Sequence, residues 1–147
     1  MKENQKQIDY CNMLIINTRA IYDTIGRIYC PILDKSIVFN AKGFHHLLYK
    51  PDGTARDVSE RIYKLTLFPL AIPVIKKSMV IKDKRNVKVR ENRKKGAKIK
   101  NMKTYSLVSM VGKENPVATR VIVSKIGNGN FTFLSIMKNN KSKTPSN

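Results

Sequence analysis

The 147-residue sequence has few acidic side chains, only two cysteines and no long apolar run. No apolar stretch reaches the roughly 18 residues that a membrane-spanning helix needs. The first residues also lack the apolar core of a signal peptide, so we expect a cytoplasmic protein. Cys11 and Cys30 lie far apart in the sequence. We expect both to be reduced and partly buried, because neither their number nor their spacing indicates a disulfide or a metal site.

The scarcity of carboxylates restricts the chemistry that the chain can support. Magnesium-dependent nucleases usually need clustered carboxylates, and the C-terminal half has only Asp83, Glu91 and Glu114. The sequence also lacks a Walker phosphate-binding loop and a Gly-rich dinucleotide-binding motif. We therefore expect neither a metal site nor a cofactor.

Basic side chains are abundant, and they are unevenly distributed. The chain has 29 Lys and Arg against 10 Asp and Glu, a formal net charge of +19. Residues 1–75 are nearly balanced, with ten basic and seven acidic side chains, whereas residues 76–103 have thirteen basic side chains against Asp83 and Glu91. Such a local positive field attracts polyanions such as nucleic acid, an anionic membrane or an acidic protein.

We expect the basic segment to contact phosphates, in a sequence-independent and salt-sensitive way. The alternative is a solvated, flexible loop without a ligand. The cations nominated for RNA binding are Arg93, Lys94, Lys95, Lys98 and Lys100.

Apolar spacing predicts helices in the first half of the chain. Residues 7–29 show helical periodicity, which Pro31 ends. Residues 57–77 show it again, but Pro69 and Pro73 interrupt it. Because proline lacks an N–H and crowds the preceding turn, we expect two short helices there.

A short strand and a further helix are expected between these segments. Residues 37–39 are β-branched or aromatic and predict a strand. Asn40 then suits a helix start, because its side chain can accept a free backbone N–H. We expect a short helix over residues 45–49 and a turn at residues 51–53, Pro-Asp-Gly.

The end of the chain predicts an antiparallel β-meander. Residues 105–111, 120–126 and 131–137 are the three expected strands. Residues 127–130, Gly-Asn-Gly-Asn, tolerate positive φ and predict a hairpin turn. Residues 93–98 are expected to form a mobile loop or the tip of a hairpin.

Helices followed by a meander indicate an α+β fold, with N-terminal helices packed on one face of a C-terminal antiparallel sheet. We expect one domain over residues 1–137 that includes a basic loop at residues 76–103. Residues 138–147 have no large apolar side chain, and we expect a frayed tail.

Both histidines of the chain, His45 and His46, follow the expected strand directly. Histidine is the commonest proton donor or acceptor in catalysis, because its pKa lies nearest neutrality. In a cationic chain, this favours an enzyme that acts on nucleic acid. Adjacent helical residues lie about 100° apart, so we expect at most one of the two to be the acid or base. The alternative is a partly buried histidine bonded to a backbone carbonyl.

Several charged side chains after the Pro-Asp-Gly turn are further candidates. Arg56 can hold a phosphate in a bidentate fork; alternatively it is a solvated surface arginine. Arg61 and Lys64 follow at helical spacing and can line the same side. Glu60 is the carboxylate nearest in sequence that can act as a base, or it can pair with Lys64 on the helix surface.

The last strands supply the remaining candidates. Alternation places Ser135 on the same face as Phe133 and Met137. Its hydroxyl can bond a phosphate oxygen or orient a histidine, or it can be a core serine bonded to backbone. Arg120 and Lys125 on the neighbouring strand are weaker candidates that can equally be surface cations.

Several of these features occur in a characteristic order along the chain: an N-terminal helix, a strand ending at Phe39, the string Gly43-x-x-His46-Leu47, Arg56 after a turn, Leu65-x-Leu67-x-Pro69, and a meander with Phe133-Leu134-Ser135. This order resembles the barnase–EndoU–colicin–RelE superfamily of RNases, and most closely its phage- and toxin-associated branch. The resemblance covers residues 8–137 and implies a barnase-, RelE- or colicin D-like fold.

The resemblance implies metal-independent cleavage of RNA by attack of the ribose 2′-OH, which leaves a 2′,3′-cyclic phosphate and a 5′-OH. It makes His46 the general base or acid, Arg56 the residue that holds the scissile phosphate, and Ser135 the hydroxyl of the final strand. The second proton-transfer group is not assigned. Secondary candidates for catalysis or phosphate binding are His45, Arg61, Lys64, Arg120 and Lys125.

For partners, the resemblance implies tRNA or another structured RNA as substrate, and an acidic antitoxin or immunity protein that covers the site. The first alternative is a non-catalytic RNA- or DNA-binding protein that grips phosphates with the sheet and the basic loop. A second alternative is a basic subunit that binds only an acidic protein.

Overall fold

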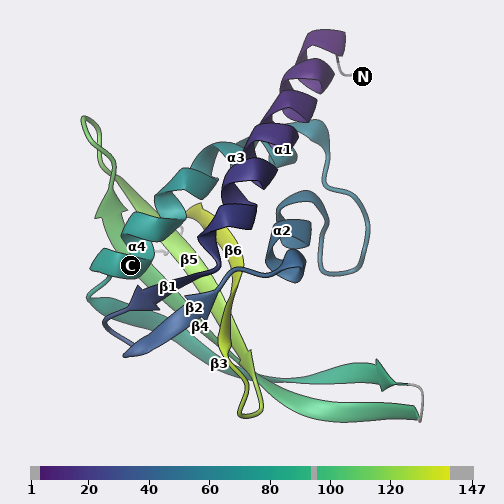
Figure 1. Ribbon diagram of the computed structural model, residues 1–147, viewed down its shortest axis with the longest axis vertical. Helices are drawn as coiled ribbons and strands as arrows, with labels where there is room; N and C mark the ends of the chain where they lie inside the picture. The colour runs from purple at the N-terminus through teal and green to yellow at the C-terminus, as the bar shows by residue number, and fades with distance from the viewer. Residues whose placement is uncertain (1–3, 94–95, 140–147) are drawn as a thin grey trace, which may run out of the picture.

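The computed structural model describes residues 4–93 and 96–139 (Figure 1). The elements, in chain order, are α1 (Gln5–Ile25), β1 (Arg27–Cys30), β2 (Lys35–Val38), α2 (Ala41–Leu48), α3 (Val58–Leu67), the 3-10 turn η1 (Phe68–Leu70), α4 (Ala71–Lys77), β3 (Val80–Arg93), β4 (Gly96–Val111), β5 (Val117–Ile126) and β6 (Phe131–Lys138). None of the described helices combines the length and the apolar character needed to cross a membrane.

The strands form one six-stranded sheet in the order β1-β2-β6-β5-β4-β3. All neighbours are antiparallel except β2 and β6, which pair in parallel. Figure 1 shows α1, α3 and α4 across one side of this sheet. The expected α+β fold is therefore confirmed, but the sheet is larger than the predicted three-stranded meander. β3 adds a fourth antiparallel strand, and β1 and β2 bring the N-terminal half into the sheet.

The predicted helix over residues 7–29 is wrong at its C-terminal end. Helix α1 ends at Ile25, and Gly26 follows with φ of 68°. A positive φ is readily adopted by glycine and breaks the helical path. Residues 27–30 then form β1 and pair with residues 35–38 of β2. The alternation of Ile28 and Cys30 toward the core accounts for this strand.

Aromatic rings join the helices to the sheet. Tyr22 of α1 lies 5.3 Å from both Phe44 of α2 and Phe68, measured between ring centroids. Phe39, at the end of β2, stacks on Phe133 of β6 at 5.1 Å. All five rings are buried. Rings at these separations add specific edge and offset contacts to the burial of apolar area, so they fix α2 against β6.

The strands β3 and β4 continue beyond the rest of the sheet. β5 ends at Ile126, opposite Met102 of β4. Beyond this point β3 and β4 remain paired with each other, from Lys88 opposite Asn101 to Arg93 opposite Gly96. We call residues 88–93 and 96–101 the arm; Figure 1 shows it extending away from the body.

The basic segment, residues 76–103, therefore contains the end of α4 and two paired strands. Residues 93–98 were expected to form a mobile loop or the tip of a hairpin. The described residues among them agree with the hairpin, because Arg93 of β3 pairs with Gly96 of β4. The described residues do not include Lys94 and Lys95, the side chains of Arg93 and Lys98, or residues 140–147 of the expected tail.

Candidate active site

The position of α2 depends on a close approach at Gly43. The side chain of Asn40 caps this helix by accepting the Gly43 N–H at 3.1 Å, as the sequence predicted. A Cβ on Gly43 would lie 2.3 Å from the Tyr22 hydroxyl oxygen and 2.7 Å from the Phe133 carbonyl oxygen. Because no side chain fits there, glycine lets α2 lie directly against β6. His46, one turn later, then lines a pocket beside β6.

Arg56 is fixed beside His46 by the folding back of the Pro-Asp-Gly turn. Its backbone N–H donates to the Leu48 carbonyl at 2.9 Å. Its Nε donates to the His46 carbonyl at 3.1 Å, and one terminal nitrogen lies 3.3 Å from a Glu60 carboxylate oxygen. The arginine side chain is only 12% exposed. These contacts hold the guanidinium at the pocket wall and leave further N–H groups for a ligand.

Lys64 covers an edge of β6 that β2 leaves open. The parallel pairing of β2 with β6 stops at Thr132, so among the described strands none pairs with the rest of β6 on that side. The Lys64 ammonium donates to the Ile136 carbonyl at 2.7 Å and to the Ser135 hydroxyl at 3.1 Å. An ammonium has three N–H donors. Two are therefore engaged by β6, and one is left for the pocket.

A β-bulge turns Ser135 into the pocket. Ile122 pairs with Ser135 and Val123 pairs with Phe133, so Leu134 has no partner on β5. An extra residue of this kind shifts the alternation of side chains. The prediction that Ser135 shares a face with Phe133 is therefore wrong, because Phe133 is buried in the core while Ser135 lines the pocket.

The pocket brings together the three residues that the sequence nominated first and one secondary candidate. His46, Arg56, Lys64 and Ser135 line a volume of about 730 Å³. Its apolar lining comes mainly from the sheet, from Met102, Ile122, Leu134 and Met137. Such an arrangement of His46, Arg56 and Ser135 is compatible with an active site. We call this volume the His46 pocket.

Two ionisable groups of the pocket, His46 and Lys64, have lowered pKa values that favour loss of a proton. Burial lowers the pKa of His46 below 6.5, and the nearby charges of Lys42, His45 and Arg56 lower it further. Burial, followed by repulsion from Arg56, lowers the pKa of Lys64 to about 8, against a partial opposing effect of Glu60. At neutral pH the imidazole is thus largely neutral and the lysine largely charged. This is the protonation pattern of a base and an acid.

His45 and Arg61 lie next to this pocket without lining it. The exposed His45 ring stacks on Tyr49 at 4.2 Å between centroids. Arg61 donates to the Leu48 carbonyl at 3.1 Å, and its guanidinium carbon lies 5.1 Å from the centre of the Tyr49 ring. Both side chains therefore support the turn after α2.

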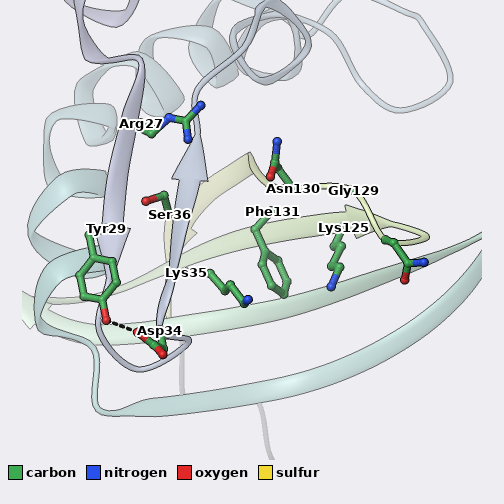
Figure 2. A pocket seen from close by; sticks show the side chains of 10 residues that line it. Arg27, Tyr29, Asp34, Lys35, Ser36, Lys125, Gly129, Asn130 and Phe131 are labelled. Carbon is green, nitrogen blue, oxygen red and sulfur yellow. Dashed lines mark hydrogen bonds between the residues drawn. The ribbon is translucent and has the colours of Figure 1, made fainter.

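Arg120 and Lys125 lie on β5 but outside the His46 pocket. Arg120 pairs with Asp83 at 2.5 Å and bonds the Asn139 side chain at 2.9 Å. The Lys125 ammonium lies 5.4 Å from the centre of the Phe131 ring. Figure 2 shows this lysine at a different pocket, which Arg27 and Lys35 also line.

Lys42 is a charged lining residue that sequence reasoning missed. It lines the His46 pocket from the first turn of α2. The signal was present, because Lys42 and His46 are four residues apart and so share one face of a helix. Lys42 adds positive charge to the wall of the pocket.

No protein-family model, curated protein or solved structure matches this chain. Among the described residues, no three His, Cys, Asp or Glu side chains are grouped so as to hold a metal ion.

Proposed function

We propose that this protein is an endoribonuclease that cleaves RNA without a metal ion, through attack of a ribose 2′-OH on the adjacent phosphate. One observation carries the proposal: a histidine, an arginine, a lysine with a lowered pKa and a serine line one pocket. This set can supply the base, the acid and the cations that the transfer needs.

The proposed reaction uses His46 as base and Lys64 as acid. The neutral imidazole removes the 2′-OH proton while the 2′-oxygen forms a bond to phosphorus. The bond from phosphorus to the 5′-oxygen breaks, and that oxygen takes a proton from the free N–H of Lys64. The products are a 2′,3′-cyclic phosphate and a 5′-OH. Solvent then returns both side chains to their starting protonation states.

Arg56 and Ser135 stabilise the charge that gathers on the phosphate. The guanidinium of Arg56 can donate two N–H groups to non-bridging oxygens. Ser135 accepts a hydrogen bond from Lys64, so its own O–H is free to donate to a phosphate oxygen. Donors that are already oriented cost little reorganisation during the reaction.

We further propose that the protein acts as a toxin in the cytoplasm, on tRNA or another structured RNA, and that an acidic antitoxin or immunity protein covers the site. The support is the resemblance to toxin-associated RNases together with the net charge of +19, which favours polyanionic partners.

The test is cleavage of total RNA in the presence of EDTA by wild-type, His46→Ala and His45→Ala proteins. We expect wild-type cleavage to persist, His46→Ala to lose at least about 100-fold in rate, and His45→Ala to stay within about threefold. Products should carry 2′,3′-cyclic phosphates, and a single 2′-deoxy substitution at the cut site should block cleavage without weakening binding.

Intact RNA with tight, salt-sensitive binding would instead favour the non-catalytic RNA- or DNA-binding alternative. The arm favours that alternative, because phosphate binding by paired basic strands needs no catalytic residue. Loss of cleavage in EDTA, with rescue by a divalent cation, would contradict the metal-independent step.

A further inference from the structure

The His46 pocket continues into two further pockets along the β5–β6 hairpin. It shares Lys42, Ser124 and Leu134 with a smaller pocket of about 150 Å³. That pocket shares Gly129 and Asn130 with a third of about 430 Å³. Because neighbouring pockets share lining residues, the three lie in a row that passes the hairpin turn at residues 127–130, and we call this row of pockets the groove.

The third pocket, which we call the Arg27 pocket, has the chemistry of a phosphate and nucleobase site. Its cations are Arg27 on β1, Lys35 on β2 and Lys125 on β5. The lining carboxylate, Asp34, accepts a hydrogen bond from the Tyr29 hydroxyl, drawn as a dashed line in Figure 2. In the part of the chain that the structure describes, neither Arg27 nor Lys35 is paired with a carboxylate. Both are therefore available to an anion.

Polar and aromatic groups accompany these cations. The side chains of Ser36, Asn128 and Asn130 line the same pocket, and hydroxyl and amide groups can bond the edges of bases. Tyr29 is 53% exposed. A cationic groove with aromatic side chains on which bases stack is typical of single-strand binding.

We propose that the whole groove binds an extended single-stranded segment of the RNA substrate, with the scissile phosphate in the His46 pocket and the phosphate of a flanking nucleotide in the Arg27 pocket. The proposal rests on the proposed ribonuclease function. It makes Arg27, Lys35 and Lys125 binding residues for RNA outside the reacting phosphate. Each of the three lies on a different strand of the sheet, so the sheet fixes their spacing.

The test separates binding from cleavage by using 2′-O-methyl oligonucleotides, which lack the attacking hydroxyl. Affinity for single strands of two and of about ten nucleotides is measured by fluorescence anisotropy. The groove variant is Arg27→Ala/Lys35→Ala/Lys125→Ala. The matched control is Lys6→Ala/Lys76→Ala/Lys113→Ala, which removes three exposed lysines outside the groove.

We expect the groove variant to lose at least about tenfold in affinity for the longer strand, because phosphate contacts supply most of such binding. The control should lose less than about threefold. Both proteins should bind the dinucleotide as the wild type does. The charge-preserving variant Arg27→Lys/Lys35→Arg should retain long-strand affinity, which separates lost charge from lost folding.

Equal losses in the groove variant and the control would overturn the proposal, as would equal affinity for a hairpin duplex of the same length. A groove variant that binds RNA normally but loses affinity for polyglutamate would overturn it in favour of an acidic protein. Failure of the proposed function looks different: no RNA is cleaved, yet long-strand affinity still depends on the groove.

Discussion

Lys64 is an ammonium group placed where its neutral form is favoured. It is 6% exposed, and its pKa falls from the usual 10.5 to about 8. The unfolded chain therefore holds this proton more tightly, which stabilises the unfolded state at neutral pH. Stability rises as pH rises from about 8 toward 10.5, because the unfolded state then loses its extra proton.

This linkage predicts a pH-dependent difference between wild-type protein and Lys64→Met. From pH 7 to pH 10, the wild-type free energy of unfolding should rise by about 2 to 3 kcal/mol relative to the variant. Denaturant titrations at several pH values measure both. The difference in free energy of unfolding between the two proteins cancels the contributions of the other titrating groups, because both proteins contain them. A difference that stays flat over this range would show that Lys64 keeps its ordinary pKa in the fold.

The rate of cleavage should have a bell-shaped pH dependence. The base, His46, must be neutral, so the rate should rise with pH through a pKa below 6.5. The acid, Lys64, must be charged, so the rate should fall above about pH 8. Initial rates across this range, corrected for RNA hydrolysis without protein, test both limbs.

The Lys64→Arg variant tells proton donation from simple charge. A guanidinium stays protonated at all relevant pH values. We expect the cleavage rate of this variant to be at least about 100-fold lower, and we expect that rate no longer to fall above about pH 8. If the variant kept full activity and lost only this fall in rate at alkaline pH, Lys64 would act through its positive charge and not as the acid.

Among the elements, α2 is the one whose placement the site needs most. We predict that Gly43→Ala lowers the free energy of unfolding by about 1 to 3 kcal/mol, because its Cβ would overlap the Tyr22 hydroxyl and the Phe133 carbonyl. Displacement of α2 should also lower the cleavage rate, because His46 lies on the same helix. Chemical denaturation and initial rates measure the two effects.

Tyr22→Phe provides the control for this clash. The Tyr22 hydroxyl donates to the Asn40 carbonyl at 2.6 Å, so the single variant should itself cost about 1 kcal/mol. Tyr22→Phe/Gly43→Ala should lose less than the sum of the two single variants, because one of the overlapping atoms is gone. Strict additivity would contradict a clash at that atom.

Local signals in the sequence predicted local structure. The Asn40 cap, the turn at residues 51–53 and the hairpin turn at residues 127–130 each depend on residues close in sequence. The first of these precedes His46 and the second lies between His46 and Arg56, which the structure brings together through the hydrogen bond from Arg56 to the His46 carbonyl. The parallel pairing of β2 with β6 and the bulge at Leu134 were not predictable in this way, because both depend on partners far away along the chain.

For the same reason, the role of Lys64 was only one possibility among several. Its helical spacing placed it near Arg56, but nothing local indicates that β6 lacks a strand on one side. The open edge is a product of the topology, since β2 turns into α2 after two paired residues. Only the folded sheet gives this lysine its two acceptors on β6 and its low exposure.

Across the whole molecule, the basic arm lies apart from the main part of the sheet (Figure 1). The described core residues on β3 and β4 begin at Leu107, so none lies in the arm, while the basic residues gather in and before it. Of the arm side chains whose burial is described, Lys88 and Ile99 are exposed, and the arm extends away from the body (Figure 1). Binding and folding should be separable by removing it.

We predict that replacing residues 89–100 with Asn-Gly, between the paired Lys88 and Asn101, leaves the free energy of unfolding within about 1 kcal/mol of wild type. The deletion removes Arg90, Arg93, Lys94, Lys95, Lys98 and Lys100. RNA affinity should fall, and the slope of log affinity against log salt should become shallower by at least about 2, because fewer counterions are released. Anisotropy titrations at several salt concentrations measure both.

A full-length arm with these six cations changed to glutamine is the matched control and should show the same slope. If the deletion kept the wild-type slope, the phosphate contacts would lie in the groove and on the body of the protein, and the arm would carry its charge for another partner.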